Sequence, residues 1–181
     1  MCTGLLCPTA WVSIAVWAII SEDMGKQDFN KTLTGLRNLC SKREYCVSDI
    51  KEKALKSLEG DGLAAAEVVS ALIKEGFLDN LRYGAAYARD KSTLSGWGRV
   101  KIRYNLMRKG LKDSEIEYAL SQIDGDKAGA RLEKLISNRM KILKGDPEWR
   151  NKLIRFALGR GYEYDDVSAA LKSVQRAHKD E

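Results

Sequence analysis

Apolar side chains recur three and four positions apart from about residue 31 to the C-terminal end, with charged and polar side chains between them. That spacing gathers the apolar residues on one face of an α-helix. Runs of alternating apolar and polar residues ended by Asn-Gly or Asp-Gly turns would indicate β-hairpins, and the sequence contains none. The pattern therefore predicts an all-α protein.

Residues that start and stop helices divide this pattern into segments of about 10 to 15 residues, which need packing to be stable. Serine and aspartate are favoured where a helix begins, and glycine is favoured just after its end. Proline fits the first helical position, so Asp146 followed by Pro147 also predicts a helix start. The predicted segments run from Ser48 to Gly60 or Gly62, Asp79 to Lys91, Ser95 to Gly110, from Asp113 or Ser114 onward, and from Asp146 to Gly159 or Gly161.

One short pattern occurs three times, first at an offset of 48 residues and then at 51. It consists of a helix, a stopping glycine, an apolar residue and a second helix with an apolar face. Each copy also has a helix upstream, near residues 31–43, 80–92 and 125–143. The matching positions are Leu58, Gly62, Leu63, Val68, Ala71 and Leu72, then Leu106, Gly110, Leu111, Ile116, Ala119 and Leu120, then Ala157, Gly161, Tyr162, Val167, Ala170 and Leu171.

A three-helix unit of about 50 residues buries little surface alone, so neighbouring units are expected to pack in a row. We therefore predict an elongated tandem array of three three-helix repeats. The repeats span residues 31–78, 79–123 and 124–181, after an apolar, irregular extension over residues 1–30. The alternative is a single compact bundle in which the spacing is a coincidence.

Positive charge is concentrated in the middle of the chain. The formal net charge is +6 at pH 7, and residues 82–112 carry nine basic side chains against one acidic. Residues 44–81 are acidic instead, with four basic and eight acidic side chains. A basic region of this kind indicates a polyanionic partner, either nucleic acid or an acidic protein surface.

Five basic side chains lie on the helix predicted to end at Gly110. At 100° per residue, three of them fall in one arc of about 100°, and the other two project to nearly the opposite side. The three are Lys101, Arg108 and Lys109, and the other two are Arg99 and Arg103. The arc is interpreted either as a surface for phosphates or acidic side chains, which we favour, or as an ordinary solvated face.

Aromatic residues are interleaved with these basic residues. Tyr83 and Tyr87 are one helical turn apart, Arg82 precedes them, and Trp97 begins the next helix. Aromatic rings can stack on exposed bases, whereas their helical spacing favours a place in the core, so both interpretations stay open. We include Arg82 and Tyr83 in the predicted partner-binding or nucleic-acid-binding surface.

The sequence offers no catalytic or metal-binding set. It lacks the G-x-x-x-x-G-K-[ST] phosphate loop and the serine elbow, and its one histidine, His178, lies in the C-terminal tail. Asp165 and Asp166 fall in the first turn of a helix, where the helix dipole favours acids. The cysteines, which form no C-x-x-C pairs, are Cys2, Cys7, Cys40 and Cys46. We expect no enzyme activity, small-molecule substrate, cofactor or metal.

The first 21 residues carry no charge and are strongly apolar over 11–20. A signal peptide has a basic segment before its apolar core, and none is present. A spanning helix needs about 20 apolar residues, a count that Pro8 and several polar residues reduce. We expect Met24 to be the functional start, with no membrane association and a cytoplasmic location.

The central part of the sequence resembles the signature of RecX regulatory proteins. The motifs that carry the resemblance are Gly76-Phe77-Leu78-Asp79-Asn80, then Tyr83, Tyr87 and Lys91, then Gly96, Gly98, Lys101-Ile102, Leu106 and Lys109-Gly110-Leu111. Upstream, Ser48 to Leu58 is similar to the first-repeat helix of that family. The resemblance covers residues 36 to 174, approximately, and Asn105 stands where the family often has Glu.

This resemblance implies a tandem three-helix-repeat protein that binds along the groove of the RecA–single-stranded DNA filament. Such a protein inhibits ATP hydrolysis and strand exchange by RecA. Its partners would be RecA and the filament, with DNA as a further direct contact. The alternative, from a different class, is a helix-turn-helix protein that binds DNA without RecA, with residues 96–109 in the major groove.

Overall fold

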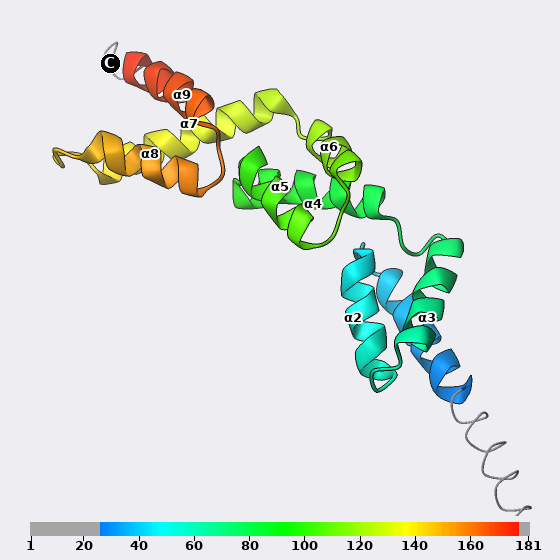
Figure 1. Ribbon diagram of the computed structural model, residues 1–181. Helices are drawn as coiled ribbons and strands as arrows, with labels where there is room; N and C mark the ends of the chain where they lie inside the picture. The colour runs from blue at the N-terminus through cyan, green and yellow to red at the C-terminus, as the bar shows by residue number, and fades with distance from the viewer. Residues whose placement is uncertain (1–25, 178–181) are drawn as a thin grey trace, which may run out of the picture. The chain divides into compact units, whose positions relative to one another are not determined.

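The structure, a computed structural model, describes residues 26–177, and every regular element among them is an α-helix (Figure 1). A first helix covers residues 26–40. The others are α2 (Val47–Ser57), α3 (Gly62–Lys74), α4 (Asn80–Ser95), α5 (Arg99–Arg108), α6 (Asp113–Ser121), α7 (Gly125–Ile142), α8 (Trp149–Gly159) and α9 (Tyr164–Ala177). The predicted all-α tandem helical fold is confirmed. The apolar segment before Met24 lies outside the described residues, and none of the helices within them is long and apolar enough to cross a membrane.

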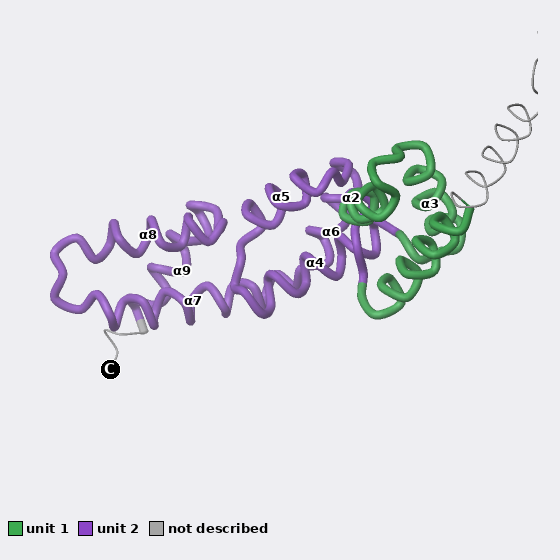
Figure 2. Tube along the Cα trace, turned by 90° about the horizontal axis from the view of Figure 1, so that it is seen from below, with its two compact units in different colours: residues 1–43, 49–78 green, residues 44–48, 79–181 purple. Residues whose placement is uncertain are grey.

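The first of two compact units contains residues 26–43 and 49–78 of the described chain (Figure 2). Its core includes Leu36, Ile50 and Leu72, one from each of its three helices. The guanidinium of Arg37 forms an ion pair with the carboxylate of Glu75, just after α3, and lowers the pKa of that carboxyl. The first helix and the end of α3 are therefore joined by charge as well as by apolar packing.

The second unit contains residues 44–48 and 79–177 of the described chain. Helices α4, α5 and α6 surround one hydrophobic cluster, which includes the fully buried Ile102 and Leu106 (Figure 1). Helices α7, α8 and α9 surround another, which includes the fully buried Leu153. We call these helix sets the second and third modules. The boundaries predicted for the three repeats stay a prediction.

Helix α5 begins at Arg99 and not at Ser95, so this predicted start was wrong. Ser95 is the last residue of α4, and Gly96 ends that helix in the left-handed conformation with a φ of 60°. Gly98 then takes an extended conformation at the N-cap of α5 and offers no side chain to cap it. The local rule failed because the cap of this helix comes from a segment distant in sequence.

The first copy of the repeat turns two residues earlier than the sequence match predicts. Gly60 has the positive φ, 94°, whereas Gly62 is the first residue of α3. In the second copy the positive φ, 76°, is at Gly110. As a result Leu63 is 82% exposed while its counterpart Leu111 is buried. At these two positions the copies match in sequence but differ in structure.

Helix α8 begins at Trp149, two residues after Pro147, so its predicted start at Asp146 was also wrong. The Asp146 carboxylate accepts hydrogen bonds from the Glu148 N–H at 2.9 Å and from the Lys152 ammonium at 2.6 Å. Both interactions stabilise the charged form, and the lysine has the larger effect in lowering the pKa of Asp146. Asp146 therefore organises a turn that precedes the helix.

This turn predicts a pH dependence of stability. Because the pKa of Asp146 is lower in the folded chain, its contribution is present above the unfolded pKa and is lost as pH falls through the folded one. We expect Asp146→Asn to melt at a lower temperature than wild type at neutral pH, with the difference vanishing below about pH 3. Thermal melts over a pH series check this, with Asp90→Asn on α4 as the control for loss of an exposed carboxylate. A difference independent of pH would contradict it.

Candidate nucleic-acid interface on helices α4 and α5

Lysine side chains of the second module lie over aromatic rings. The Lys91 ammonium is 5.5 Å from the centre of the Tyr87 ring and 5.1 Å from the centre of a Trp97 ring. The Lys101 ammonium is 4.6 Å from the centre of a Trp97 ring. One tryptophan therefore supports lysines from two helices.

The same arrangement continues toward the C-terminal end of α5. The Lys109 ammonium is 6.0 Å from the centre of the Tyr83 ring, and the Tyr83 and Tyr87 rings are 5.8 Å apart. We call the whole set the cation–ring ladder, and its members in order are Lys101, Trp97, Lys91, Tyr87, Tyr83 and Lys109. Each cation–π contact contributes about 0.5 to 1 kcal/mol at an exposed site. Lysines held in this way lose less freedom when they bind an anion.

The ladder follows from sequence spacing and one glycine. Tyr83, Tyr87 and Lys91 are four residues apart and so share a face of α4. Gly96 ends α4, and the next residue, Trp97, packs its side chain against the core of the second module. The first turn of α5 then brings Lys101 to the same ring.

The aromatic rings of the ladder are mainly core residues. Tyr83 is 8% exposed, and Tyr87 and Trp97 are partly buried against the same hydrophobic cluster. Burial raises the pKa of Tyr87, and the nearby charge of Lys109 opposes this rise. The rings thus support the lysines, and a direct contact of Tyr83 with a partner stays a prediction.

Arg99 and Arg103 face α6, away from the ladder. The Arg99 guanidinium donates to the Leu120 carbonyl at 3.0 Å, and Arg103 forms an ion pair with Glu117. The sequence placed both arginines nearly opposite Lys101, and the structure gives them contacts that join α5 to α6. Binding roles for these two residues stay predictions.

Arg82 and Arg108 differ in what surrounds them. Arg82 forms an ion pair with Glu44 at 2.5 Å, which raises the pKa of the arginine. Arg108 is exposed, with its guanidinium carbon 5.9 Å from the centre of the Tyr104 ring. Of the predicted binding residues, the structure therefore joins Lys101, Lys109 and Tyr83 in one ladder.

Sequence reasoning missed two members of the ladder as site residues, Lys91 and Trp97. The four-residue step from Tyr87 to Lys91 was a usable signal, because it places the ammonium beside the ring. No local signal places Lys101 over Trp97, since that contact depends on how α4 and α5 pack. Asn105 donates from its side-chain amide to the Lys101 carbonyl at 2.8 Å, one helical turn earlier.

The N-terminal end of α5 is covered by the loop after α8. The Gly98 N–H donates to the Arg160 carbonyl at 2.9 Å, and the Val100 N–H donates to the Gly161 carbonyl at 3.0 Å. In return the Arg160 guanidinium donates to the Ser95 carbonyl at 3.0 Å. We call this contact the glycine junction, and it supplies the helix cap that the sequence did not reveal.

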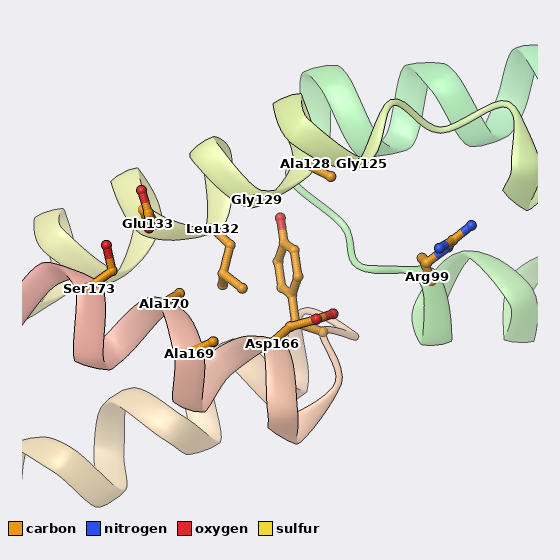
Figure 3. Close-up of a pocket in the computed structure, with 11 residues that line it drawn as sticks. Arg99, Gly125, Ala128, Gly129, Leu132, Glu133, Asp166, Ala169, Ala170 and Ser173 are labelled. Carbon is orange, nitrogen blue, oxygen red and sulfur yellow. The ribbon is translucent and has the colours of Figure 1, made fainter.

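A hollow of about 480 Å³ lies beside the junction, in the third module (Figure 3). Small residues such as Gly129 and Ala169 line it on α7 and α9, and Figure 3 shows Arg99 across from Asp166 at its rim. Within residues 26–177, no group of three or more His, Cys, Asp or Glu side chains is placed to hold a metal ion. The hollow thus offers shape and a few charges, whereas the ladder offers a row of cations.

Comparison with known proteins connects this architecture to one family. The family model for the second three-helix domain of RecX matches residues 79–120, and the model for the third matches residues 130–171. A crystal structure of RecX from Lactobacillus salivarius superposes with a TM-score of 0.73 at 22% identity, covering 83% of this chain and 98% of that one. At this identity the superposition shows the fold alone.

Two bacterial relatives named regulatory protein RecX extend the match. The Clostridium tetani protein is 34% identical over 118 residues, which is 63% of this chain and 54% of that protein. The chain therefore spans about half the length of this relative. The Clostridium perfringens protein is 30% identical over 165 residues, covering 88% of this chain and 74% of its own length. The chain therefore belongs to the RecX family of regulatory proteins.

Proposed function

We propose that the chain is a non-enzymatic regulator that binds RecA and RecA–single-stranded DNA filaments. It lowers the ATPase, recombinase and coprotease activities of RecA in recombination, repair and the SOS response. The cation–ring ladder carries this proposal, because it holds three lysines along one surface. The segment around it has nine basic side chains and one acidic, a balance that suits phosphates or acidic side chains.

The geometry of α5 argues against the alternative, a helix-turn-helix protein that reads duplex DNA without RecA. Such a protein places the N-terminal residues of its recognition helix against base edges. Here the Arg160–Gly161 loop covers that end of α5 and takes up its Gly98 and Val100 N–H groups. Lys109 lies at the opposite end of the helix. Contacts along the helix with backbone phosphates or acidic protein therefore fit better.

The proposed location is the cytoplasm, where RecA filaments form. Cys40 and Cys46 are buried and form no disulfide, as is usual in a reducing compartment. The proposed partners are a protein and nucleic acid, with no small-molecule substrate, cofactor or metal. The molecule acts by occupying the filament rather than by chemistry of its own.

Co-sedimentation tests this function directly. We expect the full chain to sediment with RecA assembled on single-stranded DNA with a non-hydrolysable ATP analogue, and to stay in the supernatant with duplex DNA alone. With ATP, added chain should slow phosphate release by RecA, and the chain alone should release none. Absence from the filament pellet, or tight binding to one duplex sequence without RecA, would overturn the proposal.

A further inference from the structure

Helix α5 has apolar side chains on two faces, and the second module buries only one of them. Ile102 and Leu106 are fully buried in its core. On the other face, Val100 is 50% exposed, Tyr104 60% and Met107 54%. We call these three residues the Val100 face. A helix that is apolar on two sides is built to have two packing partners.

The three exposed residues form a continuous stripe. Their spacing of four and three positions brings them to one side of the helix. Arginines border the stripe on both edges: Arg103 is one turn from Val100 and Met107, and Arg108 lies against the Tyr104 ring at 5.9 Å. An exposed apolar stripe with a charged rim is typical of a protein-interaction site.

We propose that the Val100 face docks into an apolar groove with an acidic rim on a protein subunit of the filament, an inference that rests on the proposed function. A helix presenting anchors at this spacing fits such a groove, and the arginines at its edges match acidic side chains. Polynucleotide phosphates offer nothing to Val100 and Met107. A second copy of the chain would bring the same basic segment against itself, with nine basic side chains and one acidic.

Two edges of one helix therefore meet two different materials. The lysines of the cation–ring ladder contact phosphates, and the Val100 face contacts protein. The charge contacts weaken with added salt, whereas the apolar contact does not. This difference separates the two surfaces by experiment.

The test compares full-length variants by fluorescence anisotropy on RecA–single-stranded DNA filaments over a salt series. Val100→Ser, Tyr104→Ser and Met107→Ser together should weaken binding at least about tenfold with the slope of log affinity against log salt unchanged. Met107→Glu alone should weaken binding in the same way by placing an acid against the acidic rim. The control changes Leu63, Leu94 and Ile142, which are 82%, 81% and 71% exposed, to serine and should retain wild-type affinity.

Circular dichroism verifies that each variant is folded, and sedimentation velocity reports self-association. Face variants that bind filaments like wild type would overturn this inference alone, as would a control that loses as much. A wild-type dimer that the face variant converts to monomer would overturn it in favour of a second copy of the chain. A wild type that fails to bind filaments would overturn the proposed function itself.

Discussion

Replacing Gly98 with alanine is expected to lower the free energy of unfolding by about 3 kcal/mol or more. A Cβ at this position would lie 2.1 Å from the Gly161 carbonyl oxygen and 2.4 Å from the Tyr162 nitrogen. Because these are main-chain atoms, they cannot rotate away, and the loop must move off α5. The Gly98 and Val100 N–H groups then lose their acceptors, and a buried donor left unsatisfied costs about 1 to 3 kcal/mol.

Chemical denaturation followed by circular dichroism measures this effect. Gly129→Ala is the matched control, because a Cβ there meets nothing within 4 Å in the exposed middle of α7, and alanine favours a helix by about 0.5 to 1 kcal/mol. Gly161→Ala should be at least as damaging as Gly98→Ala, since its φ of 85° disfavours a side chain and its Cβ would lie 2.3 Å from that of Lys101. Wild-type stability in Gly98→Ala would show that the junction can open without cost.

Changing Lys91, Lys101 and Lys109 together to glutamate is expected to weaken filament binding at least about 100-fold at low salt. The change replaces three positions of attraction by repulsion and leaves the buried Ile102 and Leu106 in place. Helicity should survive, because the lost cation–π contacts are worth only about 0.5 to 1 kcal/mol each. If each lysine meets one phosphate of single-stranded DNA, the salt slope should fall by about 0.7 per contact.

Matched variants separate the ladder from net charge. Changing the exposed Lys134, Lys144 and Lys172 of the third module to glutamate alters the net charge equally and should have a much smaller effect. Arg108→Glu, tested singly, reports whether the arginine beside Tyr104 belongs to the same surface. Anisotropy on RecA filaments over a salt series gives affinity and slope. A folded ladder variant with wild-type values of both would exclude this surface from filament binding.

Local sequence rules accounted for the features that local interactions build. Asp79 caps α4, where its carboxylate accepts hydrogen bonds from the N–H groups of Leu81 and Arg82. Gly110 turns the chain after α5 with a φ of 76°. Helical periodicity also placed Leu106 in the core, where it is fully buried. Each of these outcomes depends on residues within about one helical turn, which is the range that capping and periodicity describe.

Features that depend on distant segments were missed or misplaced. The start of α5 was placed at Ser95 because the carbonyls that cap this helix belong to Arg160 and Gly161. The contact of Lys101 with Trp97 likewise depends on the packing of α4 and α5. Sequence spacing identified where positive charge collects, but only tertiary packing showed which cations share rings and which are engaged by α6.

The glycine junction also acts as a ruler between the second and third modules. Its hydrogen bonds join main-chain atoms, and its closest approach is between glycine positions, so no side chain there can be lengthened or shortened to change the spacing. A partner with a regular repeat must therefore match this fixed interval. Two weak contacts made at a matching interval reinforce each other, because the second forms at a high effective concentration. A partner with a different interval loses that gain even if every individual contact is available.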